Sequence, residues 1–403
     1  MSPRLALFLP VLLTVPAAAY ALCHVRIIQL KSLRERIVWT FRSWHANYPV
    51  PLVMDRWQFN KENDFAVQLQ DLQRPWMFLQ SFFASRGYAL YCPDPLSQNW
   101  DLYPALTIGS NKPRCEPQFP YALRLYTDDK DIMFAFFSPR VWPARDAQGR
   151  DVVIRLVSGR IPSDELKILQ RLNTPKVRAD PRNHSIYALD YISFDGLVFV
   201  IMPRWDNAFG HDFHNVQELM HFTDAFLEGI DFLHEHRIVH CDFSEQNTGM
   251  NVLTNVHASY LTGLRDLCVS QYAIYDFGWS LIYPYNTVLE DVTVTTHFNF
   301  SFHLRGLLTP SGPHNPFQVD VLSVGLILLR WVRHIEDVVP DIGPFFDSMV
   351  TSDTTKRFTA RQALLEFRKI HSRLSLSQLD SLVTGRFWDN GRIKTKLDYP
   401  TQL

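Results

Sequence analysis

The feature that most constrains the fold of this chain is a long amphipathic segment that runs directly into a polar loop. Apolar residues recur at helical spacing through VQELMHFTDAFLEGIDFLHEH (216–236), which predicts a helix with one buried face. The sequence IVHCDFSEQN follows at once and brings His240, Asp242 and Asn247 into one loop. A further carboxylate, Asp276, comes later in YAIYDFGWS, at the end of a strand-like run. The chain therefore presents an acid and an amide in one loop and a second acid at a strand end.

The segments that precede this helix are mostly strand-like. PSDELKILQRL (162–172) predicts a helix whose start Ser163 and Asp164 can cap. A strand-rich first part followed by a helix-rich second part predicts an α+β chain with two lobes and a cleft between them. The predicted strands are IMFAFF (132–137), RVWPARD (140–146), DVVIRLV (151–157) after a tight turn at AQGR, and the pair SIYALDYI (185–192) and GLVFVIM (196–202).

The composition fits a globular protein and argues against several other classes. Of the 403 residues, 46% are hydrophobic and 20% are charged, which suits one large two-lobed domain or two ordinary ones. The formal net charge is −1, so no basic excess points to a nucleic-acid partner. The five cysteines are scattered without a CxxC, so we expect neither a disulfide framework nor a zinc site. Cys92 and Cys115 remain a candidate pair only if that region is lumenal.

The uncharged run LALFLPVLLTVPAAAYALC (5–23) defines a hydrophobic anchor or signal segment at residues 1–24. Its length fits a tilted membrane helix, whereas the upstream Arg4 and the stretch PAAAYA fit a cleaved signal peptide. A buried globular helix is the third alternative. Several Lys and Arg residues follow the run, which favours an anchor that leaves the rest of the chain in the cytosol. The expected location is the membrane, with the secretory pathway after signal cleavage as the alternative.

Residues 25–121 are expected to form an N-terminal extension of unclear fold. A basic amphipathic pattern predicts a helix from about residue 24 to residue 44. The remainder combines Trp and Phe with Pro and turn dipeptides, so we expect it to pack against the following domain. Residues 376–403 are expected to form a C-terminal tail.

Asp242, Asn247 and Asp276 are the residue types that phosphoryl transfer requires. That reaction needs a carboxylate beside the attacking hydroxyl, oxygen ligands for Mg²⁺, and cationic or backbone donors on the phosphates. Asp242 can supply the first, and Asn247 with Asp276 the second. H-x-D or D-F-G alone is weak support, but both together in this order after a long helix are much stronger.

Residues 122–375 resemble the eukaryotic protein kinase domain. VHCDFSEQN is similar to the catalytic-loop pattern H-R-D-x-x-x-x-N, and DFG to the metal-binding motif. Four further segments resemble kinase motifs in the right order. They are DVVIRLV for the strand V-A-I-K, DELKILQRL for the helix with the paired glutamate, QVDVLSVGLILL for the buried helix with Asp320, and RFTARQAL for the late segment with Arg357.

The resemblance implies a small β-rich N-lobe and a larger helical C-lobe that bind ATP and Mg²⁺ between them. It also implies a protein substrate or partner. The residues that it assigns are Asp242 as catalytic base, Arg155 and Glu165 as a modified phosphate anchor, Met202 with Arg155, Asn247 and Asp276 as cofactor-binding residues, and Asn247 with Asp276 as metal ligands.

The upstream motifs depart from the family pattern. Arg155 stands in the place of the strand lysine, and its planar guanidinium is not interchangeable with an ammonium at a tight phosphate site. The glycine-rich loop is missing. Counting back from Val141, its three glycine positions hold Phe134, Phe136 and Pro139, which do not bring backbone amides close to phosphates.

The downstream motifs depart as well. Cys241 replaces the loop arginine, so we do not expect control by a phosphorylated activation loop. No clear A-P-E precedes Asp320, and LTPS (308–311) is the nearest candidate, which leaves the usual partner of Arg357 unidentified. The long gap between Asp242 and Asp276 implies an insertion near residues 255–269.

Three functions fit this sequence. The first is a divergent ATP-dependent protein kinase of the Ser/Thr type. The second is a pseudokinase scaffold without useful turnover, which Arg155 and the lost glycines favour. The third is a small-molecule phosphotransferase of the aminoglycoside or choline type, a class that shares H-x-D-x-x-x-x-N but does not usually carry D-F-G or D-x-x-S-x-G.

Overall fold

The computed structural model describes residues 37–60, 65–93, 101–105, 118–125, 132–254, 264–295, 312–389 and 391–395. The chain divides into two compact units, residues 1–52 and 53–403. In the first unit, residues 37–45 are helical, as predicted for this stretch, and the earlier part of that predicted helix lies outside the described residues. Within the described ranges, no helix is long and apolar enough to cross a membrane. The hydrophobic run at residues 5–23 lies outside those ranges.

The second unit combines sheets and helices, which confirms the predicted α+β class. The finer expectation of a two-lobed, kinase-like domain remains a proposal. The segments around LTPS and most of the predicted insertion after residue 254 also lie outside the described residues.

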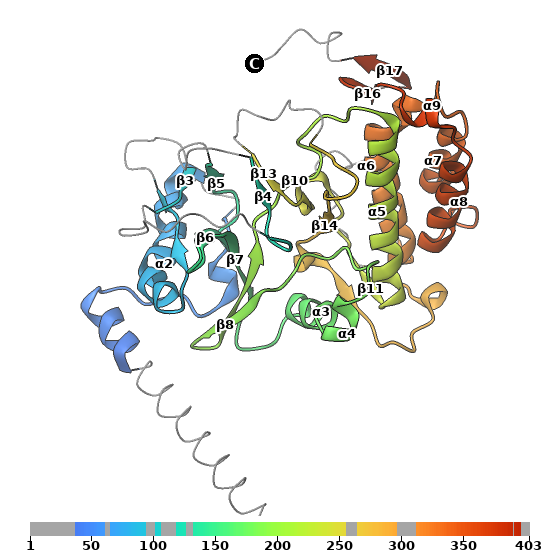
Figure 1. Ribbon diagram of the computed structural model, residues 1–403. Helices are drawn as coiled ribbons and strands as arrows, with labels where there is room; N and C mark the ends of the chain where they lie inside the picture. The colour runs from blue at the N-terminus through green and yellow to red at the C-terminus, as the bar shows by residue number, and fades with distance from the viewer. Residues whose placement is uncertain are drawn as a thin grey trace, which may run out of the picture. The chain divides into compact units, whose positions relative to one another are not determined.

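A five-stranded antiparallel sheet forms one part of this unit (Figure 1). Its strands lie in the order β1, β6, β7, β9, β8. Val152, Ile154 and Leu156 of the central strand are fully buried, because β7 is covered on both faces and flanked on both edges. The strands are β1 (Ala89–Leu90), β6 (Val141–Arg145), β7 (Asp151–Ser158), β8 (Asp190–Phe194) and β9 (Leu197–Pro203).

The turn between β6 and β7 forms where the sequence predicts it. Gly149 adopts a positive φ of 74°, which glycine reaches without steric cost. Its N–H donates to the Asp146 carbonyl at 2.8 Å, and the Asp146 carboxylate accepts from the Arg150 N–H at 2.9 Å. This turn sets the register that places Val141 opposite Arg155.

The strand predicted at residues 132–137 forms only in part. Only β5 (Phe134–Ala135) forms there, and it pairs with β3 (Asp101–Tyr103), which also pairs with β2 (Cys92–Pro93), in a separate three-stranded sheet. The position beside β6 belongs to β1 instead. A turn closed by the Val141 N–H on the Ser138 carbonyl, at 3.1 Å, redirects the chain between β5 and β6, so the two strands are not hairpin neighbours.

Residues before the sequence-predicted boundary at 121 belong to the same compact unit. Helix α2 (Phe65–Ser85) lies beside the five-stranded sheet, and the short η1 (Met54–Arg56) precedes it (Figure 1). Trp76 of α2 is fully buried, and its indole Nε1 donates to the Pro139 carbonyl at 2.8 Å. Its ring centroid lies 5.7 Å from those of Trp142 and Phe199. The extension expected to be separate therefore supplies core to the sheet from residue 53 onward.

Residues 118–125, which we call the strap, contact both the five-stranded sheet and the part of the unit that follows it. Its strand β4 (Leu123–Arg124) pairs in parallel with β13 (Val252–Leu253). Arg124 forms an ion pair with Asp151 of β7 at 3.0 Å, and Arg150 lies over the Tyr121 ring at 3.8 Å. The strap thus contacts the start of β7 and β13 at the same time.

The helices gather in the C-terminal half, where α5 packs along α6 and α8 (Figure 1). Helix α5 spans Val216–Glu235, which confirms the predicted amphipathic helix, and Asn215 caps it by accepting from the Glu218 N–H at 3.0 Å. The predicted cap of α3 is confirmed too, because Ser163 accepts from the Leu166 N–H at 3.1 Å. The helices are α3 (Asp164–Leu172), α4 (Pro175–Arg178), α5, α6 (Pro316–Val332), α7 (Ile342–Val350), α8 (Ala360–Ser372) and α9 (Leu376–Leu379), with 3₁₀ turns η3 (Glu245–Asn247), η5 (Phe277–Trp279), η6 (Leu289–Asp291) and η7 (Arg333–Ile335).

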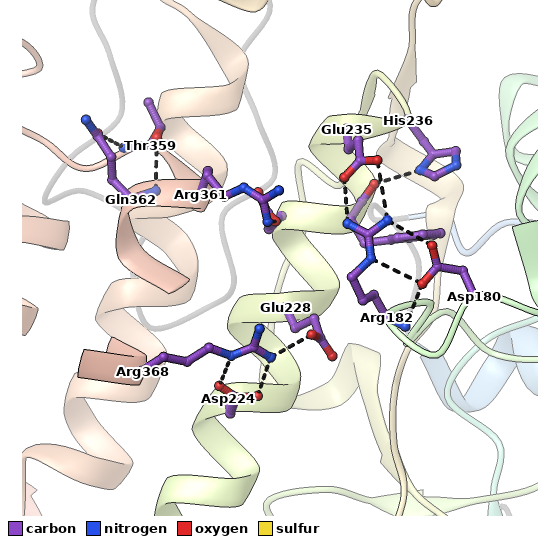
Figure 2. A network of polar contacts seen from close by, with 12 residues as sticks. Asp180, Arg182, Asp224, Glu228, Glu235, His236, Thr359, Arg361, Gln362 and Arg368 are labelled. Carbon is purple, nitrogen blue, oxygen red and sulfur yellow. Dashed lines mark hydrogen bonds and ion pairs between the residues drawn. The ribbon is translucent and has the colours of Figure 1, made fainter. Parts of the chain in front are cut away.

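Acidic side chains on the outer face of α5 form a seam of ion pairs with arginines of other segments. Figure 2 shows Arg368 of α8 between Asp224 and Glu228 of α5, with N–O distances of 2.7 and 2.6 Å. Arg361 of α8 contacts Asp231 in the same way, at 2.8 Å. The seam fixes α8 along α5 while the apolar faces of both helices contribute to the core.

The C-terminal residues expected to form a tail are also part of the second unit. The Val216 N–H donates to the Ser381 carbonyl at 3.1 Å, and the Val383 N–H donates to the His214 carbonyl at 3.0 Å, so residues 381–383 pin the start of α5. The remaining strands are β10 (Asp206–Asn207), β12 (Thr248–Met250) and β14 (Tyr272–Ile274) in one sheet, and the pairs β11 (Ile238–Val239) with β15 (Leu281–Ile282) and β16 (Arg386–Asp389) with β17 (Arg392–Thr395).

Candidate functional site

The loop after α5 and β11 is held by a buried carboxylate of α6. Asp320 accepts the backbone N–H of His240 at 2.6 Å and that of Cys241 at 2.8 Å. Cys241 needs this support because its φ is 64°, in the left-handed region that L side chains rarely adopt. Helix α6 therefore fixes the loop conformation through Asp320.

The His240 ring holds the backbone of Asp242, two residues further along the loop. Burial lowers the pKa of His240, so the ring is neutral and acts as a donor on one side and an acceptor on the other. Its Nε2 bonds the Tyr275 carbonyl at 3.0 Å, and its Nδ1 accepts from the Asp242 N–H at 3.3 Å. His240 therefore joins the loop to the backbone that precedes Asp276.

Asp242, predicted as the catalytic base, and Asn247, predicted as a metal ligand, are in direct contact. The Asn247 amide nitrogen donates to the Asp242 carbonyl at 2.7 Å and to its carboxylate Oδ2 at 3.0 Å. Both donations use the amide nitrogen, and the amide oxygen of Asn247 accepts no hydrogen bond from the described residues. The turn η3, which carries Asn247, closes this pair across the loop.

Arg155 and Glu165 form an ion pair between β7 and α3. The Arg155 Nε donates to Glu165 Oε1 at 2.6 Å, and both side chains are largely buried. The N-terminal cap of α3 places Glu165 in the first helical turn, facing the sheet. This contact confirms that the predicted pair is brought together.

Asp276 completes the cluster from the other side of Arg155. Its carboxylate accepts from Arg155 Nη1 at 3.1 Å through Oδ2, and from Nη2 through Oδ1. Oδ1 also accepts the Gly278 N–H at 3.2 Å, and Asp276 has a φ of 65° at the start of η5. One guanidinium therefore bridges two carboxylates from different elements.

The charges of this cluster shift the pKa values of its members. Burial alone lowers the pKa of Arg155, but the carboxylates of Asp276 and Glu165 outweigh it and hold that pKa above its usual value. Burial raises the pKa of Glu165, and the Arg155 guanidinium opposes that rise. Nearby Arg140 has a lowered pKa, mainly through burial and then through the charge of Arg155. Arg155 therefore carries its charge throughout the accessible pH range.

A cavity of about 720 Å³ opens beside the cluster. Arg155, Asn247 and Asp276 line it together with apolar side chains from the sheet, and such a size suits a cofactor-sized ligand. The apolar lining includes Val141 of β6, Val153 of β7, Met202 of β9 and Ile186.

Four of the six predicted site residues line this cavity: Arg155, Met202, Asn247 and Asp276. The other two, Asp242 and Glu165, are not among the lining residues. Each contacts a residue that is, Asp242 through Asn247 and Glu165 through Arg155. The structure thus brings all six to one place. Phe134 lines the cavity as well, although it does so from the separate sheet.

Sequence reasoning missed two residues that shape the site. Arg204, directly after β9, lines the cavity, and its Nη2 donates to the Met133 carbonyl at 2.6 Å. No motif marks that position. Gly278 approaches the cluster closely, since a Cβ there would lie 3.0 Å from Arg155 Nη2 and 3.1 Å from Asp276 Oδ1. D-F-G includes this glycine, but only the structure shows that it makes room for a guanidinium.

The arrangement does not fit a divalent cation at Asp276. Mg²⁺ requires oxygen ligands in near-ideal octahedral geometry. Both oxygens of Asp276 accept from Arg155, whose positive charge takes the position next to the carboxylate. Among the described residues, no group of three or more His, Cys, Asp or Glu side chains is placed to hold a metal ion. The resemblance implies Asp276 and Asn247 as Mg²⁺ ligands. Of these two side chains, only Asn247 keeps an oxygen that accepts no hydrogen bond from the described residues.

Comparisons with known proteins do not assign a family to this chain. No family model matches it, and a search of curated proteins finds no matching relative. The functional argument therefore depends on the residues of the site.

Proposed function

We propose that residues 53–403 form a divergent, two-lobed protein kinase-like domain that binds ATP in the cavity beside Arg155. The observation that carries this proposal is the Glu165–Arg155–Asp276 cluster, which joins a strand, a helix and a strand end at one cavity. The Asp242–Asn247 pair lies at the same cavity. Six residues that were assigned from residue types or from the resemblance meet there, which supports the kinase-like interpretation.

The chemistry of the cavity suits a nucleotide. Val141, Val153 and Met202 provide an apolar wall of the kind that receives a flat base. Arg155 provides a permanent cation for phosphate oxygens at the polar end. ATP bound here would place its phosphates toward the cluster and its base toward the sheet.

A binding experiment tests this proposal. The chain is titrated with ATP, and the free energy of unfolding is measured alongside. At a ligand concentration one hundred times Kd, we expect ATP to stabilise the wild-type protein by about 2.7 kcal/mol. The variant Val153→Phe extends a ring into the cavity and should lose at least about tenfold in affinity. The matched control Leu365→Phe adds the same ring on the exposed face of α8 and should bind normally.

Absence of saturable ATP binding to the wild-type chain would contradict the proposal. Equal affinity in Val153→Phe and the wild type would place the nucleotide outside this cavity.

Transfer of the γ-phosphoryl group to a protein Ser or Thr hydroxyl is a second candidate function, and the Asp242–Asn247 contact favours it. Asp242 would accept the hydroxyl proton, and the Asn247 amide holds its carboxylate in one orientation. The Arg155–Asp276 pair favours binding without turnover instead, because it occupies both oxygens of Asp276. Radiolabelled ATP separates the two.

In the labelling experiment, the wild-type chain is compared with Asp242→Asn and with Asp347→Asn, an exposed control on α7. If transfer occurs, Asp242→Asn should lose about a hundredfold or more in rate while the control keeps its activity. Equal incorporation in wild type and Asp242→Asn would eliminate the transfer function and leave nucleotide binding alone.

A further inference from the structure

Arg155 makes three hydrogen bonds that occupy part of its donor capacity. A guanidinium carries five N–H donors in a fixed planar fork. Nε donates to Glu165, and Nη1 and Nη2 each donate to Asp276. Because no other bond of Arg155 is formed within the described residues, two donors remain, and Arg155 lines the cavity. The arginine is therefore held by two acids and still has donors for a third anion.

This geometry places a positive charge where a bound metal ion would otherwise bridge Asp276 to a phosphate. A bridging cation neutralises repulsion between a carboxylate and phosphate oxygens. Arg155 contacts both Asp276 oxygens and has free donors, so it provides the same neutralisation with hydrogen bonds in place of metal–oxygen bonds. Lysine has a single ammonium and cannot form this bridge with both carboxylates in a planar fork.

A second cation strengthens the positive character of this region. Arg140 lies in the turn between Ser138 and Val141, two residues that line the cavity, and it is half-buried. Its guanidinium has no hydrogen bond or ion pair with any described residue. The Arg140 carbonyl accepts from the Leu156 N–H at 2.8 Å, which holds Arg140 beside β7, the strand that carries Arg155. Arg155 thus stands at the position of the family's lysine, and Arg140 directly follows the segment in which the family has its glycine-rich loop.

We infer that Arg155 takes the place of a divalent cation at Asp276, so that the cavity binds the phosphates of ATP without metal. This inference rests on the proposed nucleotide binding. It also explains why Mg²⁺ does not fit at the Asp276 carboxylate, where Arg155 occupies both oxygens. The amide oxygen of Asn247, by contrast, accepts no hydrogen bond from the described residues.

Calorimetric titration of the full chain with ATP tests the inference directly, once in excess EDTA and once in excess Mg²⁺. For the wild type, the two Kd values should agree within about threefold. Arg155→Lys releases at least one oxygen of Asp276, so its affinity should become metal-dependent, with Mg²⁺ tightening binding at least about tenfold. Arg368→Lys, the same change in the α5–α8 seam, should behave as the wild type does.

The wild-type comparison needs no variant, so the test does not depend on whether Arg155→Lys folds. Wild-type binding that weakens at least about tenfold in EDTA would overturn the inference and leave the proposed function intact. Absence of ATP binding under both conditions would overturn the proposed function and the inference with it. Metal-independent binding by Arg155→Lys would also contradict the role assigned to the guanidinium.

Discussion

At the scale of single residues, buried side chains decide how the loop and the cluster are built. Arg155 differs from lysine in shape more than in charge, since its planar fork donates to Glu165 and to both oxygens of Asp276 at once. Asp320 likewise acts through geometry, because its two oxygens each accept one backbone N–H of the loop. Substituting either residue therefore leaves buried partners without their bonds.

Replacing Asp320 with alanine should destabilise the protein by about 3–5 kcal/mol. The change leaves two buried N–H groups unpaired and removes the support for the left-handed Cys241. Urea denaturation measures the loss. The control Asp347→Ala removes an exposed acid paired with Arg333 and should cost under about 1 kcal/mol. A similar, small loss in both variants would contradict the anchoring role of Asp320.

Residue types and spacing predicted Asp242, Asn247 and Asp276, which suit phosphoryl transfer. The resemblance to protein kinases assigned Arg155, Glu165 and Met202. Asp242 and Asn247 lie in one loop, so their contact follows from local sequence alone. Gly278 and Arg204 were not predicted as site residues, since their roles depend on what packs around them. The bidentate contact of Arg155 with Asp276 joins residues far apart in the chain and required the fold.

At the scale of elements, α5 combines a buried apolar face with a charged outer face. Its apolar face follows the helical spacing that the sequence shows. Its acids pair with arginines of α8 and of the loop after α4, where Arg182 bonds Glu235 at 2.7 Å (Figure 2). Helix pairing was therefore foreseeable from the pattern, whereas the choice of ionic partners was not.

The seam between α5 and α8 should give the protein a defined pH dependence. Burial tends to raise the pKa of Glu228, but hydrogen bonds from His184 and Arg368 hold it below the ordinary value of 4.5. Because the folded-state pKa is depressed, the stabilisation is complete above 4.5 and is lost as the pH falls through the lowered value. At pH 7, Arg368→Gln should cost about 1 kcal/mol in this half-exposed seam.

Denaturation of both proteins between pH 7 and pH 3 checks this expectation, and the difference between them should shrink as Glu228 becomes protonated. Lys369→Gln, which removes the exposed pair with Glu366 on the same helix, should change stability by no more than about 0.5 kcal/mol. A difference that grows at low pH would contradict the sign derived from the pKa of Glu228.

The sequence predicted where the main strands lie in the chain, but not which strands pair with one another. Long, β-branched β7 and β9 were predicted with nearly correct bounds. The strand beside β6 consists of two residues, Ala89–Leu90, far from it in the chain, so no local pattern identifies it. The turn after Ser138 redirects the chain, so β5 pairs with β3 in a separate sheet and not with β6.

At the scale of the whole molecule, several aromatic residues between positions 53 and 91 belong to the core of the second unit. Trp57, Trp76 and Phe83 are fully buried against the sheet and against one another. The abundance of Trp and Phe in this region predicted packing but not its target. A chain without these residues would lose a large part of the apolar burial around the sheet.

Two truncated chains should therefore behave differently. Residues 53–403 should unfold cooperatively with the thermal midpoint of the second unit in the full chain. Residues 122–403 should not fold, because loss of each buried tryptophan alone costs about 3–5 kcal/mol against a typical total of about 5–15 kcal/mol. Near-ultraviolet circular dichroism and urea denaturation report both results. A folded 122–403 chain would show that α2 and β1 are dispensable.

The strap has a mechanical consequence for the cavity. Its Leu125 N–H donates to the Leu253 carbonyl of β13 at 2.8 Å, while Arg124 holds Asp151 of β7. Trp205, which lines the cavity, also donates its indole N–H to the Pro120 carbonyl at 2.8 Å. Any hinge-like widening of the cavity must therefore stretch the bonds that the strap makes with β7, with β13 and with Trp205. Under the proposed nucleotide binding, exchange of ATP would depend on side-chain motion at the rim of the cavity, and substitutions in residues 118–125 should change its residence time.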